Sequence, residues 1–532
     1  DSGGARRVRG VRVRTGGDMD GADGAEDAVD LCAPSVVITT GTFMRGLMHT
    51  GDRRTPGGRH GEGSSSAISE SLRALGFAMG RLKTGTPPRL RLGSIDWAGL
   101  DAQPGDAEPQ PFSELTPSAW TGADEAVRTG AFELDRSPLL EQVECRRTRT
   151  SEAGYEAARM NLHRAPMYSG EIGSAGPRYC PSFEDKVVRF PERREHGVFL
   201  EPEGLGSDWV YCNGISSSLP PDVQDVIVRT MPGCERAEIL RYGYAVEYDM
   251  VRPHQINATC ETKRVAGLFL AGQINGTSGY EEAAGQGVVA GISAARRARG
   301  ETGWVPGRHE AYIGVLMDDL VTKTPVEPYR MFTSRAEHRL LLRADNAADR
   351  LTPMAKELGL LETTELGRRR WGLYESRRAR LESIRGVIGR EKVGGEPLSK
   401  AIRRPGFGEA ELASVARTGG VDAPGAAVFT AWADARYEAY VVRERAEIRR
   451  QAEMERKRLP GWLDYRAVEG LRGEAAEALA RFRPETFGQA GRLEGVTPAD
   501  MSLIAVHVRR GMARVCRVGA ESTPTPGVSA RG

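Results

Sequence analysis

An apolar run that leads through a glycine turn into a helix of small residues constrains the fold of this chain most strongly. Residues 265–271 read VAGLFLA, residues 272–279 read GQINGTSG, and residues 281–297 are rich in alanine and glycine. The order strand, glycine turn, helix is typical of an α/β nucleotide-binding unit. A second β-branched run, residues 35–40, also ends in a glycine, Gly41. The two runs predict two buried strands of one α/β domain.

The glycine turn is the first candidate ligand site. Glycine lets backbone N–H groups approach a ligand closely, and the start of a helix favours anionic or electron-rich atoms. The turn therefore predicts contact with a flavin ring or a phosphate through Gly272, Gln273, Asn275 and Gly276. Close packing of the helix on the strand is the alternative. No complete GxGxxG fingerprint follows the first strand, although enzymes of this build normally open with one.

The chain divides into four parts, residues 1–95, 96–239, 240–300 and 301–532, because the two strand–glycine-turn units are separated by a long loop-rich region and the pattern changes after residue 300. The first part also holds a predicted helix over residues 69–76. The first and third parts should form one discontinuous α/β domain, and the second should include an inserted domain. Helical spacing after residue 300, and a helix start at Thr497-Pro498, predict a helical fourth part.

Composition excludes several classes of protein. No apolar run reaches the roughly 18 residues that would span a membrane. The seven cysteines form no CxxC pair, which favours a reducing compartment, and the eight histidines show no metal-ligand spacing, so no metal is expected. A net charge of +2 does not by itself demand a polyanionic partner. The chain begins at Asp1 and no targeting signal can be read from it.

Cys180 is the candidate nucleophile. It stands in GPRYCPSFEDKVVRF, residues 176–190, between a tyrosine and a proline. A thiolate forms more readily beside cations, and Arg178 and Lys186 are the nearest in sequence. The alternative is a small buried apolar residue, which is what most free cysteines are.

Three groups of charged residues have two interpretations each. Cations in glycine- and proline-rich segments predict phosphate or folate binding, with solvated loop residues as the commoner alternative; these are Arg59, Lys83, Arg89, Arg178 and Lys186. Residues 368–385 carry seven arginines against two glutamates, which predicts a phosphate-binding or a solvated helix face. Asp318 and Asp319 are catalytic candidates, but capping or ion pairing is the stronger interpretation.

Many strings of the chain resemble one family over about residues 35–510. They are VVITTGTFMRG, GRLKTGTPPRL, NLHRAPMYSG, GPRYCPSFEDKVVRF, FLEPEGL, NGISSSLP, GYAVEYD, LFLAGQINGTSGYEEAAGQG, EAYIGVLMDDLVTK, EPYRMFTSRAEHRLLLRADNAADRLT and RPETFGQAGRLEGVTPADMSLI. Together they resemble the tRNA uridine 5-carboxymethylaminomethyl modification enzymes, the MnmG or GidA family (glucose-inhibited division protein A), which includes mitochondrial relatives.

The resemblance implies a fold and an activity. The fold is a glutathione-reductase-like Rossmann domain for FAD, here N-terminally truncated, with an inserted α/β domain and a C-terminal helical domain. Residues 1–95 and 240–300 would form the FAD-binding domain, 96–239 the insertion and NAD-binding region, and 301–532 the tRNA- and partner-binding domain. The activity uses FAD, NADH and methylenetetrahydrofolate, and works with the GTPase MnmE at C5 of the wobble uridine of tRNA.

The resemblance also implies site residues and a setting. Cys180 matches a family cysteine that is implicated in catalysis, and a second such cysteine lies in the amino-terminal flavin fingerprint, which this sequence does not contain. The nicotinamide-contacting stretch matches residues 176–190, with Gly176, Pro177, Arg178, Tyr179 and Lys186 as its contacts. Flavin contacts match Gln273 and Ser69. A homodimer is implied, in the bacterial cytoplasm or in a eukaryotic organelle matrix such as that of mitochondria.

Two alternatives remain beside this function. A folate- and flavin-dependent tRNA uracil methyltransferase has a similar flavin-binding domain, but it is shorter and lacks the helical tail. A truncated paralogue that only binds tRNA or the GTPase would need no flavin, so its purified form would be colourless.

Overall fold

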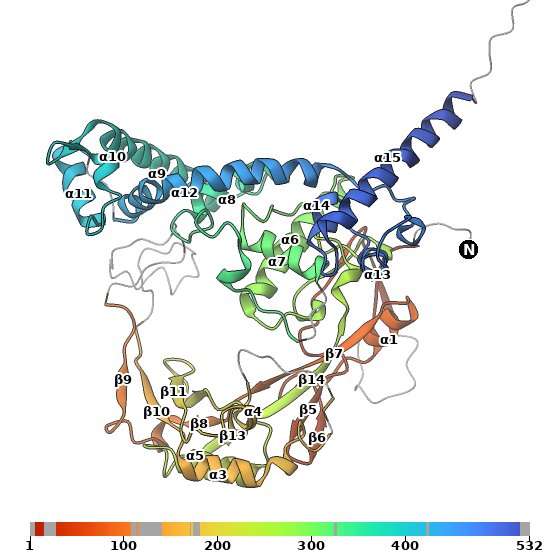
Figure 1. Cartoon of the computed structure of the whole chain (residues 1–532). Coiled ribbons are helices and arrows are strands. Elements are labelled where there is room, and N and C mark those ends of the chain that lie inside the picture. The colour runs from red at the N-terminus through yellow and green to blue at the C-terminus, as the bar shows by residue number, and fades with distance from the viewer. Residues whose placement is uncertain are drawn as a thin grey trace, which may run out of the picture.

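The computed structural model describes residues 6–14, 28–107, 113, 115, 141–170, 172–173, 181–323, 327–421 and 425–521, and side chains of the last helix up to residue 510. Figure 1 shows a sheet covered by helices at one end of the molecule and a second, smaller sheet beside it. A helical part crosses the opposite end. The predicted combination of an α/β core with a helical region after residue 300 is therefore observed.

Short parallel strands form the α/β core. β4 (Val36–Ile38) pairs with β16 (Leu268–Leu270), and β1 (Arg6–Arg7) pairs with β15 (Val265–Ala266), both in parallel. The single strand predicted over residues 265–271 is divided at Gly267, whose φ of +81° breaks the ladder. β4 is also less buried than predicted, with Val37 39% exposed, because in the described part of the chain it pairs only with β16.

Two long helices pack on these strands. α6 (Tyr280–Ala298) and α7 (Tyr312–Thr322) bury Val289, Leu316 and Leu320 against β16 in one apolar core. The helices predicted over residues 281–297 and 69–76 are confirmed as α6 and as α1 (Ala67–Ala74). A separate hairpin pairs β2 (Gly10–Arg14) with β3 (Ala28–Cys32) in antiparallel orientation.

A four-stranded antiparallel sheet joins the core to the rest of the chain. Its order is β6 (Arg53–Pro56), β5 (Leu47–Thr50), β14 (Tyr244–Val251) and β7 (Met79–Thr86). One face carries Met48, Leu82, Tyr248 and Met250, whereas the other carries polar residues that are also buried: His49, Lys83, Glu247 and Asp249. Two buried faces of opposite character are unusual, because buried charges are costly unless they are paired.

A six-stranded antiparallel sheet forms the lower lobe in Figure 1. Its order is β13 (Ile239–Arg241), β8 (Arg89–Arg91), β12 (Trp209–Asn213), β11 (Gly197–Pro202), β10 (Cys145–Arg149) and β9 (Asp101–Gln103). α3 (Glu152–Met160), α4 (Phe183–Arg189) and α5 (Pro221–Arg229) share its apolar core. β8 and the end of β13 lie just outside the predicted 96–239 segment, and the division into domains stays a prediction.

The helical part contains the remaining elements. They are α8 (Ala347–Glu357), α9 (Glu365–Arg390), the hairpin β17 (Lys392–Val393) and β18 (Glu396–Pro397), α10 (Leu398–Ala401), α11 (Glu409–Thr418), α12 (Gly425–Arg456), α13 (Gly473–Phe482), α14 (Phe487–Arg492) and α15 (Pro498–Glu521).

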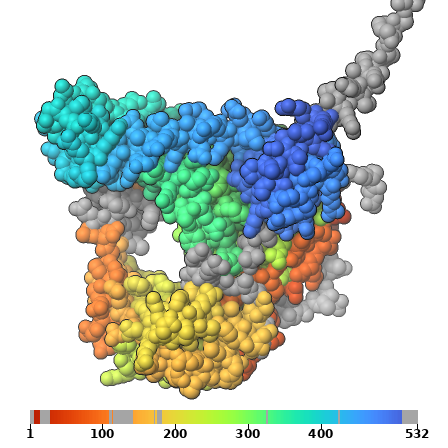
Figure 2. All heavy atoms as spheres, viewed as in Figure 1, coloured from red at the N-terminus to blue at the C-terminus, as the bar shows by residue number. Residues whose placement is uncertain are grey.

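Helix α12 spans the helical part from one end to the other. It joins the cluster of α9, α10 and α11 to the cluster of α13, α14 and α15 (Figure 1). α15 begins at Pro498, as predicted from Thr497-Pro498, and the Thr497 hydroxyl contacts the Asp500 carboxylate at 2.6 Å. Figure 2 shows an open space between the lower lobe and the helices above it.

Candidate functional site

The predicted glycine turn lies at the carboxyl edge of two parallel strands. β4 leads into Gly41 (φ +55°) and β16 into Gly272 (φ +89°), and both conformations favour glycine. Gln273 opens a single turn, Gln273–Asn275, which Gly276 (φ +83°) ends. The carboxyl edge of parallel strands is where α/β folds bind ligands, so the turn is in the position that the prediction requires.

A buried amide network fixes the shape of this turn. The side-chain oxygen Oε1 of Gln286 accepts from the Gly272 backbone N–H at 3.1 Å and from the Asn275 side chain at 2.9 Å. The Asn275 amide also donates to the Leu270 carbonyl at 2.7 Å, and Gln286 donates to the Thr277 hydroxyl at 3.0 Å. Asn275 and Gln286 are completely buried. Their side chains therefore hold the turn, and Gln273 is the member of the turn that stays partly exposed.

Strand β14 separates the predicted contact Gln273 from the predicted contact Ser69. Tyr248, whose pKa is raised by burial, is adjacent to Gln273, and the next residue, Asp249, points to the opposite face. There the Ser69 hydroxyl donates to Asp249 at 2.7 Å. Ser69 is completely buried, so in this structure its hydroxyl positions Asp249.

Asp249 gathers three arginines that were not among the predicted site residues. Arg73 lies 2.5 Å, Arg81 2.8 Å and Arg45 3.5 Å from its carboxylate oxygens. Burial raises the pKa of Asp249, but hydrogen bonds from Ser69, Arg81 and Arg73 outweigh it, so the pKa lies below its ordinary value. The alternation of Arg81 and Lys83 with apolar Leu82 along one strand was the available signal.

Lys83 corrects the prediction of a solvated loop cation. It lies in β7 and is only 3% exposed, with its Nζ 2.7 Å from the Met167 sulfur. Gly80 and Gly85 made the segment resemble a loop, although they are accommodated inside the strand. On the same buried face, His49 and Glu247 lie 3.3 Å apart. The buried polar and charged side chains of the four-stranded sheet therefore lie together on this face.

Two further predicted contacts, Lys186 and Arg89, lie in the neighbouring lobe. Lys186 on α4 donates from Nζ to the Gly214 carbonyl at 2.7 Å. Arg89 lies in β8 and pairs with Glu203, so it is not a loop cation either, whereas Arg59 pairs with Glu62 on the surface. Gly176, Pro177, Arg178, Tyr179 and Cys180 lie outside the described residues, and their roles stay predictions.

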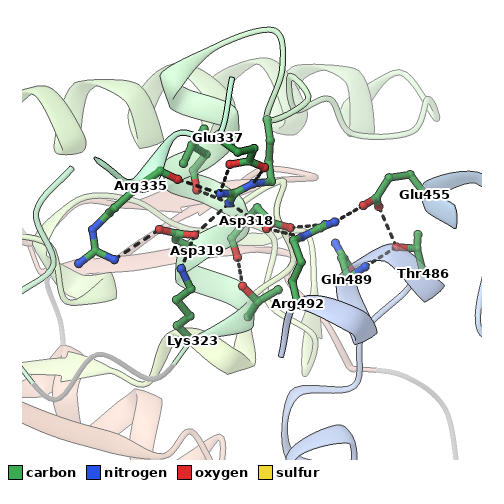
Figure 3. A network of polar contacts seen from close by, with 12 residues as sticks. Asp318, Asp319, Lys323, Arg335, Glu337, Glu455, Thr486, Gln489 and Arg492 are labelled. Atoms are coloured by element: carbon green, nitrogen blue, oxygen red, sulfur yellow. Dashed lines mark hydrogen bonds and ion pairs between the residues drawn. The ribbon is translucent and has the colours of Figure 1, made fainter. Parts of the chain in front are cut away.

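Ion pairing, the stronger interpretation of Asp318 and Asp319, is confirmed. Asp318 on α7 receives two bonds from Arg492 on α14, at 2.7 and 2.8 Å (Figure 3). Arg308 contacts both aspartates, at 3.0 and 2.9 Å, and Lys323 contacts Asp319 at 2.9 Å. The contact of Arg492 with Asp318 joins α14 of the helical part to α7 of the α/β core.

The arginine-rich segment 368–385 lies in α9 and is partly ion-paired. Arg377 contacts Asp349, Arg378 contacts Glu382, and Arg385 contacts Asp434. These pairs favour the interpretation of α9 as an ordinary charged helix surface.

The described residues contain neither a metal-ligand cluster nor a membrane-spanning helix. No group of three or more histidine, cysteine, aspartate or glutamate side chains in these residues is arranged to hold a metal ion. None of the helices in the described part of the chain is long and apolar enough to cross a membrane.

Comparison with known proteins identifies the family. A model described as "Glucose inhibited division protein A" matches residues 21–302, and one described as "tRNA modifying enzyme MnmG/GidA C-terminal helical bundle" matches residues 447–527. Relatives named tRNA uridine 5-carboxymethylaminomethyl modification enzyme MnmG are 47% identical in Rhodopirellula baltica and 46% in Myxococcus xanthus. These alignments cover 94% and 91% of this chain, and 72% and 75% of the relatives.

A solved structure supports the same conclusion. GidA of Aquifex aeolicus, in one crystal form, superimposes with a TM-score of 0.78 at 40% identity, covering 90% of this chain and 77% of that one. The likeness confirms the predicted fold class, an α/β core with a helical part. On these matches, the chain belongs to the MnmG/GidA family.

Proposed function

We propose that this chain is a tRNA-modifying enzyme that uses FAD and NADH to install a carboxymethylaminomethyl-type group at C5 of the wobble uridine. The observation that carries the proposal is identity of 46–47% to relatives of that name across more than nine-tenths of the chain. The match of residues 447–527 to the family's helical bundle favours this function over the uracil methyltransferase, which lacks such a tail. The proposed co-substrate is methylenetetrahydrofolate.

The residues of the glycine turn fit a flavin. Gly41 and Gly272 add no side chain of their own at the carboxyl edge of β4 and β16, and a Cβ on Gly41 would meet no atom closer than 3.7 Å. The partly exposed Gln273 is the side chain that would contact the ring, and the backbone of Gly272 and Gly276 would lie along it. When bound, the flavin supplies hydride transfer. The chain contributes the shape of the turn through Gln286 and Asn275.

Uracil chemistry explains the proposed role of Cys180. Carbon C5 of uracil is a poor nucleophile until a group adds at C6, and a thiolate adds and leaves readily. Lys186 is held in the same segment through Gly214, on the helix that begins three residues after Cys180. We propose Cys180 as the nucleophile or proton-transfer group, and residues 176–190 as the nicotinamide contact.

Partners and setting are proposed on the same basis. The GTPase MnmE and part of the tRNA would bind the helical part, and two copies of the chain would form a homodimer. The compartment would be the cytoplasm in a bacterium or an organelle matrix in a eukaryote.

The test measures wobble nucleosides by mass spectrometry in tRNA from cells that lack the protein. Expressing the wild-type chain in these cells should restore the modified uridine. The Cys180→Ser variant should yield about 100-fold less modified uridine, or even less, as expected for losing a nucleophile or acid–base group. The matched control is Cys32→Ser, a change at an exposed cysteine of the β2–β3 hairpin. Full modification by Cys180→Ser would remove the catalytic role. A purified chain without flavin absorbance that still binds tRNA would favour the non-catalytic paralogue.

A further inference from the structure

The three arginines around Asp249 form a cluster with unbalanced charge. Arg45, Arg73 and Arg81 share one carboxylate that is 1% exposed. Among their other contacts in the described residues, only Arg81 approaches a second carboxylate, that of Glu247 at 3.9 Å, and Glu247 also contacts His49. Three guanidinium groups therefore face little more than one negative charge. The surplus of positive charge is what an anion would neutralise.

The three arginine side chains are partly exposed and come from separate segments. Their side chains are 48%, 39% and 28% exposed for Arg45, Arg73 and Arg81, whereas the carboxylate that organises them is buried. Arg45 belongs to the turn before β5, Arg73 to the last turn of α1, and Arg81 to β7. α1 lies at the edge of the molecule in Figure 1. A buried anchor with exposed donors is a preorganised arrangement, because the donors do not need to be ordered on binding.

The backbone at Arg45 supports a role in binding. Arg45 has a φ of +46°, a left-handed conformation that is uncommon for a residue with a side chain. Its carbonyl accepts two bonds from Arg81, both at 3.2 Å, which hold it there. Such strain persists only where surrounding contacts enforce it, and it concentrates at binding sites.

We propose that Arg45, Arg73 and Arg81 bind a backbone phosphate of the RNA substrate. This inference rests on the proposed function. Arginine presents a planar fork that matches phosphate oxygens, and side-chain cations supply most of the affinity for RNA backbones. The pyrophosphate of a dinucleotide is instead held mainly by backbone N–H groups at a glycine turn and helix start. Exposed arginines at the edge of the molecule therefore favour RNA over the flavin.

The experiment measures the affinity of the full chain for an unmodified tRNA transcript between about 50 and 200 mM salt, the range over which phosphate contacts lose affinity. The variants are Arg45→Gln, Arg73→Gln and the double change. The matched control is Arg194→Gln, because Arg194 is an exposed arginine with one exposed partner, Glu152. Each single change at the cluster should weaken binding about 3- to 10-fold, and the double change should lower the salt slope by up to about one, the contribution of a single phosphate. Arg73→Lys should recover part of the loss, and the control should change neither value.

Two results would overturn the proposal. One is an unchanged affinity and salt slope in the double variant, shown by circular dichroism to be folded. The other is a loss of FAD binding with unchanged tRNA affinity, which would assign the cluster to the flavin pyrophosphate. Modification activity is recorded separately. If wild-type chain modifies no uridine but the cluster variants still lose tRNA affinity, the proposed chemistry fails and the phosphate site stands.

Discussion

At the scale of single residues, buried polar side chains do most to shape the candidate site. The Gln286 side chain accepts hydrogen bonds from the Gly272 N–H and the Asn275 amide, and it donates one to the Thr277 hydroxyl. A side chain that satisfies several groups in a low-dielectric interior cannot be replaced without leaving them unpaired. The rigidity of the turn that would receive a flavin therefore depends on Gln286.

Gln286→Ala should destabilise the protein and disturb the turn. Removing the amide leaves buried donors at Gly272 and Asn275 without an acceptor, which costs about 2–4 kcal/mol at the level of a broken buried network. The change in the free energy of unfolding can be measured by denaturant titration. Gln451→Ala, at an exposed residue of α12, is the control and should change it little. Equal stabilities for the two variants would contradict the role assigned to Gln286.

His254 should make the junction with α13 sensitive to acid. Burial, together with Lys263, Arg481 and Arg252, lowers its pKa to about 4 from an ordinary 6.5, and its ring packs against Phe482. Between those two pH values the unfolded chain binds a proton that the folded chain does not. Stability is therefore lost as pH falls from 6.5 to 4, on the order of 1 kcal/mol per pH unit.

The test of His254 compares the pH dependence of stability. His254→Gln should flatten the fall in the free energy of unfolding between pH 6.5 and 4.5. His60→Gln, at an exposed loop histidine, should leave the wild-type slope. A slope that is the same in all three forms would show that other groups control acid unfolding.

At the scale of elements, the contact between α7 and α14 joins the α/β core to the helical part. Arg492 and Asp318 meet in a two-bonded fork, with Glu455 of α12 on the other side of the same guanidinium (Figure 3). A half-buried fork with every oxygen engaged is specific in geometry, although its net contribution to stability is modest.

Asp318→Asn should loosen this contact. Removing one charge leaves Arg492 and Arg308 partly unpaired, and breaking a buried pair in this way costs about 2–4 kcal/mol. Hydrogen exchange should become faster in α13 and α14 while α6 keeps its protection. The matched control is Glu382→Gln, which breaks an exposed pair with Arg378 on α9. Uniformly faster exchange throughout the chain would show that Asp318 supports the core and not the junction.

Sequence patterns predicted those elements whose signals are local. Thr497, Pro498 and Asp500 predict the start of α15, and a run of small residues after a glycine turn predicts α6. β7 was misread because glycines inside a strand resemble a loop, and its burial depends on β14, which is distant in sequence. The cluster at Asp249 was missed for the same reason, since its members come from four separate segments.

At the scale of the whole molecule, the lower lobe is inserted between two neighbouring strands. The chain leaves β7 for β8 and returns from β13 to β14, and β7 and β14 pair along their whole length. The returning segment is held at Gly243 by the side chain of Gln224 on α5. This side chain accepts from the Gly243 N–H at 2.7 Å and donates to the Gly243 carbonyl at 3.0 Å. A Cβ at Gly243 would lie 2.8 Å from the Thr86 carbonyl oxygen, so the two connections are packed together.

Gln224→Ala should weaken the attachment of the lobe. It removes both bonds to Gly243 and leaves its buried N–H unpaired, at a cost of about 1–3 kcal/mol. Limited proteolysis should become faster between residues 241 and 244, while cleavage elsewhere keeps its wild-type rate. Asn213→Ala, which removes an exposed bond to Glu201, serves as the control. Unchanged proteolysis in Gln224→Ala would mean that strand pairing alone fixes the lobe.

The side-by-side connections also set an order for folding. Thr86 and Tyr244 are neighbours in the β7–β14 ladder but are separated in the chain by the entire lobe. Closing so long a loop before its interior is ordered has a large entropic cost, whereas a folded lobe delivers the two strand ends already adjacent. The lobe, which has its own apolar core, should therefore fold first, and the pairing of β7 with β14 should follow as a late, cooperative step.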